Sequence, residues 1–500
     1  MIAYDELRYP GRFYPQASIE RMAMLGTLHG LEPPAVQGCR VLELGCGEGG
    51  HLIPLAYVFA DSEFLGVDLS EVSVGRAKNV AAQLGLKNLR FKTEDLGAFP
   101  GNAGTFDYII AHGVFSWIPP AIQEKLLEVC SRHLSPKGVA YVSYNTYPAG
   151  HLRRIPRDLA RFHTRHISDP RRKAQETRAI LNFVISALPE GTMQRELLRR
   201  ESAAYLQSEP LMVFDLLAEI NEPMYFLDFI DQAAGYGLQF IAESDVQKMR
   251  TAHLPEEARK QLDAVSDRLL REQYLDFIHG RGFRQTLLCR AGHDLDLEVT
   301  PRRMEQLLVA SSLRPQKAIE NVNGGEAAEF RDVQGRTVST SEALPKAAYL
   351  ELGGAYPHAL RYRDLRARAC KRAEMELPLD AVTEAKLIRM LVSSFANGVA
   401  EFHVYQAPFQ REVSDRPVAN LVARYQAPTD LPVTSMCLTS FAMADPVLRQ
   451  LLPLLDGSRD HQQLLAELRA RLPASALEGF TAERLENALG TLAEYGMLVG

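Results

Sequence analysis

The sequence predicts an α/β protein built on a mostly parallel, Rossmann-like sheet, and three observations indicate this class. Short apolar segments alternate with amphipathic ones over residues 40–145, a glycine-rich turn follows the first apolar segment, and an acid ends the second. Parallel strands need crossover connections, usually helices, and these cover both faces of the sheet. At 500 residues, of which 46% are hydrophobic, the chain is long enough for about three domains.

The elements of the sheet follow from the spacing of apolar residues. After an aromatic leader, a helix is predicted over 17–30, and Pro33 and Pro34 end it. Strands are predicted at 40–44, 63–67, 89–92, 106–111 and 139–144, and helices at 49–60, 71–84 and 120–134. After a helix over 226–236, the segments 238–242 and 283–289 are predicted to be a returning pair of strands that completes a seven-stranded sheet.

Changes in composition divide the chain into five parts. We predict an N-terminal sheet domain at 1–150, a helical insertion at 151–215, a region that completes the sheet at 216–292, an α+β middle domain at 293–425 and a mostly helical C-terminal domain at 426–500. In the middle domain, residues 329–340 are typical of a hairpin around Gln334 and Gly335. The basic insertion is interpreted as the solvated face of a dimerising helix rather than a docking surface for RNA or an acidic protein, because it lacks interleaved stacking aromatics.

Composition excludes several functional classes. No apolar run reaches the roughly 18–20 residues that span a bilayer, and the start of the chain has no basic segment typical of a signal peptide. A net charge of −6 does not favour nucleic acid or an anionic membrane as a partner. The six cysteines are widely spaced without a CxxC pair, so we expect no metal site, no disulfide framework and a reducing, cytoplasmic compartment.

The most informative stretch is the segment 41–50, VLELGCGEGG, in which a strand enters a glycine-rich turn and a helix follows. Glycines allow the tight turn and let a ligand lie against the backbone, whose first helical amides point at polar ligand atoms. The candidate cofactor-binding residues here are Glu43, Gly45, Cys46, Gly47 and Gly49. Because a lone G-x-G-x-x-G match is weak evidence, a purely structural turn is the alternative interpretation.

Acidic residues after the second and third strands sharpen the prediction. Asp68, followed by Leu69, ends the second strand, where a carboxylate accepts both ribose hydroxyls in nicotinamide enzymes and in S-adenosylmethionine enzymes. Glu43 favours S-adenosylmethionine, because that ligand carries an ammonium and a sulfonium instead of a pyrophosphate. Asp95 is the candidate acceptor for an adenine amino group, with capping of a turn as the alternative.

The other residues of that third-strand edge, Glu94 and Leu96, are included in the candidate cofactor site, although a solvated position is the alternative for Glu94 and for Glu48.

Taken in order, the E-x-G-x-G-x-G string, Asp68, the segment FDYII at 106–110 and LSPKG at 134–138 resemble the class I S-adenosylmethionine-dependent methyltransferases over residues 38–145. The resemblance implies S-adenosylmethionine as the cofactor. It also implies that Ala111 and His112, after the fourth strand, face its methionine end.

A narrower resemblance covers most of the chain. The strings YDELRYPGRFYPQ, HGVFSWIPP, VSYNTYP, NEPMYFLDF, GLQFIAESD and QYLDF-x5-FRQTLL are similar to those of bacterial methyltransferases with a methyltransferase regulatory domain, the group that includes the rickettsial protein lysine methyltransferases. This resemblance implies a cofactor-binding core with an N-terminal lid, a dimerising insertion, a middle domain, a winged-helix-like C-terminal domain and protein lysine as substrate. The chain departs from the group at Ala149–Gly150 and at Phe214, positions that bear on substrate identity.

Methyl transfer to an amine requires an aligned, neutral nucleophile about 3–3.5 Å from the methyl carbon. A desolvated aromatic channel lowers the pKa of a lysine and holds its ammonium by cation–π attraction. The candidate catalytic residues follow strands four and five and are His112, Trp117, Tyr144, Asn145 and Tyr147. Packing beneath the loop is the alternative for Phe115 and Trp117, and a hydrogen-bonded loop residue is the alternative for His112. The leader tyrosines, Tyr4, Tyr9 and Tyr14, are candidates for a lid over the cofactor.

The sequence leaves several alternatives open. The same enzyme class acting on a small metabolite or on RNA is the first, and a nicotinamide-dependent oxidoreductase is the second. A non-catalytic scaffold protein that retains the cofactor fold is the third.

Overall fold

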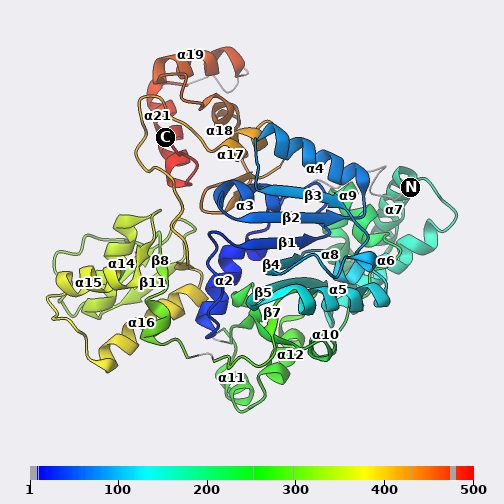
Figure 1. The fold of residues 1–500 in the computed structure, drawn as a ribbon, viewed down its shortest axis with the longest axis horizontal. Coiled ribbons are helices and arrows are strands. Elements are labelled where there is room, and N and C mark those ends of the chain that lie inside the picture. Colours follow the sequence, from blue (N-terminus) through cyan, green and yellow to red (C-terminus); the bar gives the residue numbers. More distant parts are fainter. Residues whose placement is uncertain (1–7, 9–10, 252, 297, 430, 473–479) are drawn as a thin grey trace.

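The fold is described from a computed structural model, which covers residues 8, 11–251, 253–296, 298–429, 431–472 and 480–500. Its centre is a seven-stranded sheet in the order β3-β2-β1-β4-β5-β7-β6 (Figure 1). The strands are β1 (Arg40–Leu44), β2 (Glu63–Asp68), β3 (Leu89–Thr93), β4 (Phe106–Ala111), β5 (Leu134–Asn145), β6 (Leu238–Glu243) and β7 (Phe283–Arg290). β1 to β5 pair in parallel, and β7 pairs antiparallel with both β5 and β6. This sheet confirms the predicted fold class.

Helices cover both faces of the sheet because successive strand residues point to opposite sides. One face packs against α2 (Ile19–Leu28), α3 (Leu52–Val58) and α4 (Glu71–Gln83), and the other against α5 (Pro120–His133) and α10 (Phe226–Gly235). In β1, Val41 belongs to the first core and Leu42 to the second. α11 (Glu256–Asp263) and α12 (Arg268–His279) precede β7.

Two predicted boundaries are wrong for local reasons. α3 begins at Leu52 instead of Gly49, because Gly49 has a φ of +75°, which no right-handed helix contains. β5 begins at Leu134 instead of Val139, and Gly138 within it lies so close to Asp107 that a Cβ there would approach the Asp107 carbonyl oxygen to 2.8 Å.

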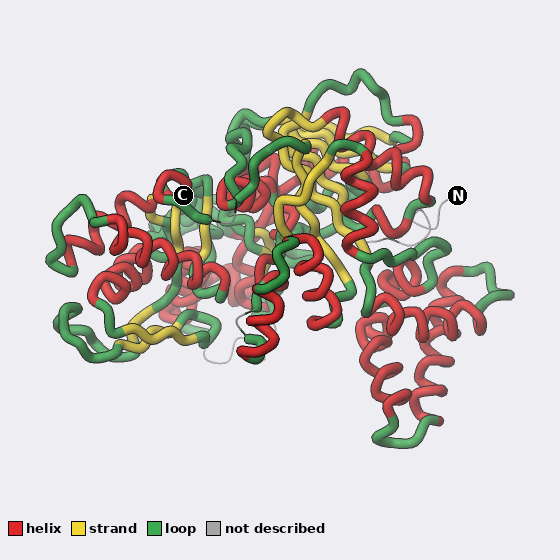
Figure 2. The backbone as a smooth tube through the Cα atoms, turned by 90° about the horizontal axis from the view of Figure 1, so that it is seen from below, coloured by secondary structure: helices red, strands yellow, loops and turns green. Residues whose placement is uncertain are grey.

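The insertion forms a separate helical lobe with its own core, at the right-hand end in Figures 1 and 2. It consists of α6 (Ala149–His163), α7 (Pro170–Ala187), α8 (Met193–Gln207), the short α9 (Glu209–Leu211) and a π-helical turn, η4 (Met212–Leu216). The chain then returns through residues 217–225 to α10 beneath the sheet.

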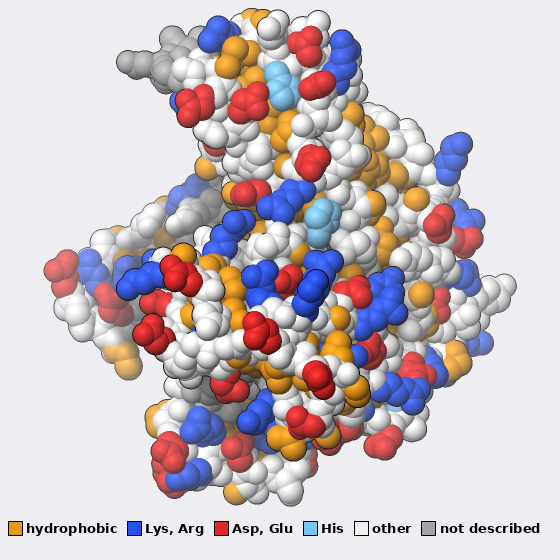
Figure 3. Space-filling model, turned by 90° about the vertical axis from the view of Figure 1, so that its left-hand side faces the viewer, with side chains coloured by type: hydrophobic (Ala, Val, Ile, Leu, Met, Phe, Trp, Pro, Cys, Tyr) orange, Lys and Arg blue, Asp and Glu red, His pale blue; other side chains and the backbone are white. Residues whose placement is uncertain are grey.

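The middle domain and the C-terminal domain lie at the other end of the molecule. The first contains α13 (Pro301–Met304), β8 (Leu308–Ala310), β9 (Arg314–Pro315), β10 (Ala328–Arg331), β11 (Thr337–Thr340), α14 (Ala343–Ala355), β12 (Leu360–Arg361), α15 (Tyr362–Arg372), α16 (Ala381–Ala396) and β13 (Glu401–His403). β10 and β11 are the predicted hairpin. Figure 3 shows acidic and basic side chains interspersed over this end of the molecule.

The C-terminal domain has its own leucine-rich core. Its elements are α17 (Leu421–Gln426), β14 (Val433–Thr434), β15 (Ser440–Phe441), α18 (Pro446–Leu451), α19 (His461–Arg471) and α21 (Ala482–Glu494). The five-part division at 150, 215, 292 and 425 stays a prediction. In the described part of the chain, no helix is both long and apolar enough to cross a membrane.

Candidate active site

A loop of positive-φ glycines lies at the carboxyl edge of the sheet, at the end of β1. On one side of β1 the strand order continues to β2 and β3, and on the other side to β4 and β5, so the order reverses here. Gly45, Gly47 and Gly49 have φ angles of +74°, +51° and +75°. The amides of Gly45 and Cys46 donate to the Val67 carbonyl at 2.8 and 3.0 Å, which fixes the loop to β2. Open α/β sheets bind their ligands at such a switch point. A Cβ on Gly47 would meet nothing within 4 Å, so the loop faces open space there.

Asp68, at the end of β2, lies beside this loop. Its Oδ2 accepts from the Gly47 amide at 2.8 Å, and its Oδ1 accepts from the Ser70 amide at 2.9 Å. Both oxygens of an ionised carboxylate accept hydrogen bonds, which is the chemistry that the two hydroxyl groups of a ribose require. The side chain is half-buried, and the neighbouring Leu69 is 56% exposed, which is unusual for a leucine beside a core strand.

Glu43 is the most unusual group of the crevice. Its carboxyl is buried in β1, and its Oε2 makes no hydrogen bond within the described residues. Burial, and secondarily the charge of Asp68, raises the pKa of Glu43 well above its usual value. A buried carboxylate without a partner costs several kcal/mol, on the order of 1–3 for the lost hydrogen bond alone. The position therefore suits a ligand that brings a cation.

The N-terminal leader closes over the glycine loop. A Cβ on Gly50 would lie 2.3 Å from the Gly11 carbonyl carbon, so the two backbones are in direct contact. The Phe13 ring stacks on His51 at 5.0 Å, and the Tyr14 ring lies 3.8 Å from that of His112. A lid formed by Tyr14 stays a prediction, and Tyr4 and Tyr9 lie outside the described residues.

The leader also overturns one expectation. Glu48, for which a solvated position was the alternative, is buried and forms ion pairs with Arg8 and Arg76, both at 2.9 Å. The pair with Arg8 ties the leader to the glycine loop, and the pair with Arg76 ties the loop to α4.

A polar network follows β4 and β5. The Nδ1 of His112 lies 2.9 Å from the Tyr141 hydroxyl and 3.5 Å from the Ser143 hydroxyl, which accepts from the Gly113 amide at 2.8 Å. Burial, reinforced by the neighbouring His51 and Arg12, lowers the pKa of His112 to about 3. The imidazole is therefore neutral at physiological pH and a weak base.

The other candidate catalytic residues follow the ends of β4 and β5. Asn145 ends β5 beside the crevice; its amide nitrogen donates to Ser116 at 2.8 Å and its side chain donates to Asn221 at 2.7 Å. Tyr147 stacks on His151 at 4.1 Å, at the start of α6. Trp117 ends a short 3-10 turn (Phe115–Trp117) and is partly exposed.

The structure contradicts a direct catalytic role for Tyr144. The ring is fully buried in the core on the α10 side of the sheet, stacks on Phe229 at 4.1 Å, and its hydroxyl lies 3.2 Å from that of Thr286. Successive strand residues face opposite sides, so Tyr141 and Ser143 share the face of His112 and Tyr144 does not. Phe115 likewise packs in that core, as its alternative interpretation stated.

The adenine edge contains the remaining candidates. Asp95 is exposed and accepts from the Gly97 amide at 2.8 Å, so it does cap the turn that follows β3. Glu94 and Leu96 are half-buried, and Ala111 is fully buried at the end of β4. Their roles toward a ligand stay predictions.

These features fit S-adenosylmethionine. The buried Glu43, whose Oε2 makes no hydrogen bond within the described residues, suits its ammonium. The carboxylate of Asp68 suits its ribose, and the glycine loop leaves room for the part of the ligand between them. The fold and the site thus define a class I S-adenosylmethionine-dependent methyltransferase.

Comparisons with known proteins place the chain further. Family models match at residues 35–186 (methyltransferase domain), 208–290 (predicted methyltransferase regulatory domain) and 415–487 (PKMT, C-terminal winged helix domain). The Rickettsia prowazekii protein RP028 is 32% identical over 234 residues, which are 46% of this chain and 94% of RP028. The chain belongs to this family of methyltransferases with a regulatory domain.

Two further relatives extend the comparison. RP789 of Rickettsia prowazekii is 34% identical over 328 residues, which are 65% of this chain and 59% of that protein, so the match leaves a large part of RP789 uncovered. The structure of PKMT2 from Rickettsia typhi in complex with AdoHcy matches with a TM-score of 0.86 at 24% identity, over 98% of this chain and all of that one. The whole fold, including both C-terminal domains, is thus shared with PKMT2.

Proposed function

We propose that this protein transfers methyl groups from S-adenosylmethionine to lysine side chains of other proteins. The observation that carries the proposal is the crevice itself. The buried carboxyl of Glu43, which suits a cation, and the carboxylate of Asp68, which suits a ribose, lie there beside a neutral polar network at the ends of β4 and β5. Support for a protein acceptor comes from the match of residues 415–487 to the PKMT winged helix domain and from the fold shared with PKMT2.

Bound in this crevice, the cofactor would supply an electrophilic methyl group on a sulfonium. Glu43 would hold its ammonium, Asp68 its ribose, and Leu69, Asp95 and Leu96 would lie toward its adenine. Tyr14, whose ring lies 3.8 Å from that of His112, would close the site from the leader side and exclude water.

The acceptor amine has to be neutral before it attacks. His112 is a poor candidate for a base, because its pKa of about 3 leaves it unable to retain a proton near neutral pH. Its contact with Tyr141 instead makes it a positioning residue. Asn145, at the end of β5, is the group that we assign to the acceptor amine, whose N–H bonds an amide oxygen can accept.

The helical insertion is proposed to form a homodimer. Large apolar side chains are exposed on it, at Ile155, Phe162, Phe183 and Met193, with exposed fractions of 49%, 66%, 64% and 79%. Exposed apolar patches of this kind mark protein interfaces. Light scattering after size exclusion should give twice the chain mass of 55.7 kDa, and a monomer at micromolar concentration would contradict the proposal.

The function is tested by incubating the protein with a bacterial lysate and methyl-labelled S-adenosylmethionine. The label should enter protein, and acid hydrolysis of that fraction should yield methylated lysine. Asp68→Ala serves as the inactive control. Label in RNA or in small molecules instead would favour the other acceptor classes, and cofactor binding without label transfer would favour a scaffold.

A further inference from the structure

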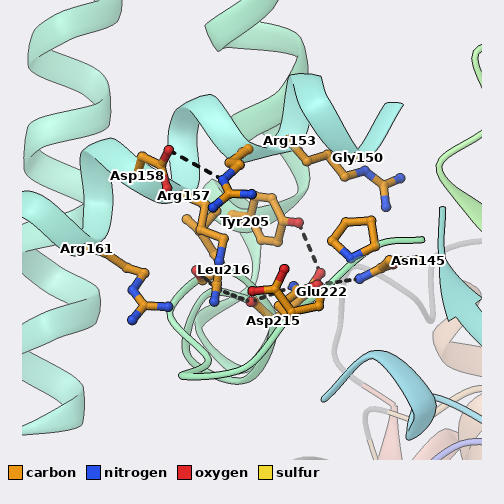
Figure 4. Close-up of a pocket in the computed structure, with 13 residues that line it drawn as sticks. Asn145, Gly150, Arg153, Arg157, Asp158, Arg161, Tyr205, Asp215, Leu216 and Glu222 are labelled. Carbon is orange, nitrogen blue, oxygen red and sulfur yellow. Dashed lines mark hydrogen bonds and ion pairs between the residues drawn. The ribbon is translucent and has the colours of Figure 1, made fainter. Parts of the chain in front are cut away.

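A cavity of about 300 Å³ lies between α6 and the segment that follows α8, next to the end of β5 (Figure 4). Asn145 forms part of its wall, and α6 contributes Arg153, Arg157 and Arg161, which are spaced four residues apart on one helical face. Asp215, Asn221 and Tyr205 face the same space. The cavity therefore joins the insertion to the acceptor side of the site described above.

The arginines of α6 hold the segment in place. Arg157 donates to the Leu216 carbonyl at 2.6 Å and to the Ala218 carbonyl at 2.5 Å, and Arg161 donates to the Glu219 carbonyl at 2.9 Å. These carbonyls lie at and just after the end of the π-helical turn, where no continuing helix supplies partners for them. The two guanidinium groups thus fix the backbone that bears Asp215 and Asn221.

A chain of hydrogen bonds runs along this segment to β5. The Tyr205 hydroxyl donates to Asp215 Oδ2 at 3.0 Å, and Asn221 Nδ2 donates to Asp215 Oδ1 at 2.7 Å. Asn145 Nδ2 donates in turn to Asn221 Oδ1 at 2.7 Å. Each link connects side chains, and the last one spans 76 positions of the sequence.

The direction of each hydrogen bond in this series follows from the carboxylate of Asp215 at its end. An ionised carboxylate only accepts hydrogen bonds, so Asn221 has to present its NH₂ group to Asp215 and its carbonyl to Asn145. Asn145 must then use its own NH₂ group toward Asn221. The amide oxygen of Asn145 takes no part in these hydrogen bonds, and an amide oxygen can accept N–H bonds from an amine.

We propose that Asp215 is a positioning residue which, through Asn221, sets the amide orientation of Asn145, and that the cavity is the subsite that receives an amine acceptor. This inference rests on the proposed function and deepens it, because it names the hydrogen-bonded residues, Asp215, Asn221 and Asn145, that select an amine acceptor. Charged side chains of both signs line the same space, namely Arg153, Arg154, Arg157, Arg161, Asp158, Asp215 and Glu222.

This series of hydrogen bonds can be tested by moving the carboxylate from position 215 to position 221. In Asp215→Asn the carboxylate is lost, so Asn221 and Asn145 are free to reverse and present NH₂ to the acceptor. In the double variant Asp215→Asn with Asn221→Asp, the carboxylate at 221 accepts from both neighbours, so Asn145 is forced back to its original orientation.

Label transfer to lysate protein at saturating cofactor should fall about ten- to hundredfold in Asp215→Asn, since misplacement of an acceptor group by about 1 Å has an effect of that size. The double variant should recover to within about threefold of the unchanged protein. Affinity for S-adenosylhomocysteine and the melting temperature should be the same in all three proteins. A full rate in Asp215→Asn, or a double variant as slow as the single one, would overturn the proposal.

A second readout does not depend on turnover. With ¹⁵N-labelled asparagine, the Asn145 side-chain NH₂ resonance, assigned by its loss in Asn145→Asp, should shift in Asp215→Asn and return toward its original position in the double variant. An unmoved resonance would refute the relay. If the unchanged protein methylates nothing in the lysate, the proposed function fails, while this resonance still decides on the relay.

Discussion

Substitution of Glu43 by glutamine gives the most informative test of the cofactor site. The carboxyl is 4% exposed, its Oε2 has no partner within the described residues, and burial together with Asp68 raises its pKa well above the usual value. Without a ligand, Glu43 therefore binds a proton far more tightly than an exposed glutamate. A cofactor ammonium placed against it lowers that pKa, so binding should release the proton.

The magnitude follows from the interaction that glutamine removes. A hydrogen bond to a charged group contributes about 1.5–3 kcal/mol, which corresponds to a roughly 10- to 150-fold loss of affinity. Glutamine has nearly the same shape as a protonated glutamate, so the unliganded protein should be no less stable. The affinity of the unchanged protein should rise with pH until Glu43 is ionised in the free state, because a released proton favours binding at high pH.

The assay is isothermal titration calorimetry with S-adenosylhomocysteine in two buffers of different ionisation enthalpy. The unchanged protein should release protons, and Glu43→Gln should release fewer and bind more weakly. Glu63→Gln, an exposed position at the start of β2, is the matched control and should behave as the unchanged protein. Equal proton release and equal affinity in the unchanged protein and in Glu43→Gln would refute the reasoning.

Three further changes test the fold around the site. Gly50→Ala should displace the leader and weaken binding of S-adenosylhomocysteine severalfold, because its Cβ would lie 2.3 Å from the Gly11 backbone. Gly75→Ala, whose Cβ would meet nothing within 4 Å, should bind normally, and its free energy of unfolding should rise by up to about 1 kcal/mol. Equal effects of both substitutions would contradict the contact. Burial alone would lower the pKa of His403, but the charges and hydrogen bonds of Glu20 and Glu401 together raise it to about 10, above about 6.5 in the unfolded chain. This interaction should therefore stabilise the protein below about pH 6.5 and lose its effect as the pH rises toward about 10. In urea unfolding, the free energy of unfolding should change less between about pH 6.5 and about pH 10 in His403→Gln than in the unchanged protein. An identical change in both proteins would refute this interaction. Arg284→Met should cost about 3–5 kcal/mol in the same assay, because it leaves three buried acids with one cation fewer, and a loss below 1 kcal/mol would contradict this cluster.

Much of the fold was predictable because it depends on local patterns. Alternating strands and helices, the glycine turn and the acid that ends β2 lie within about a hundred residues, and each has a direct physical signature. The two returning strands were identified from their apolar runs, although they follow the insertion. The start of α3 was not identified, because the sequence alone does not reveal the left-handed φ of Gly49.

The acceptor side of the site was predicted less well. Tyr144 and Asn145 are neighbours on one strand, so the alternation of side chains already forbids both from facing the same side, and Tyr141 with Ser143 were the residues to consider. Asn221 and Asp215 could not be found in this way, because their link to Asn145 depends on how the insertion folds back onto β5. The ion pairs of Glu48 likewise join segments that are distant in the sequence.

A crystal structure with S-adenosylhomocysteine tests the central claim most directly. The ribose should contact Asp68, the ammonium should contact Glu43, and the sulfur should face the space bounded by Tyr14, His112 and Asn145. A ligand bound elsewhere, or a nucleoside turned so that its sulfur points away from the end of β5, would contradict the account.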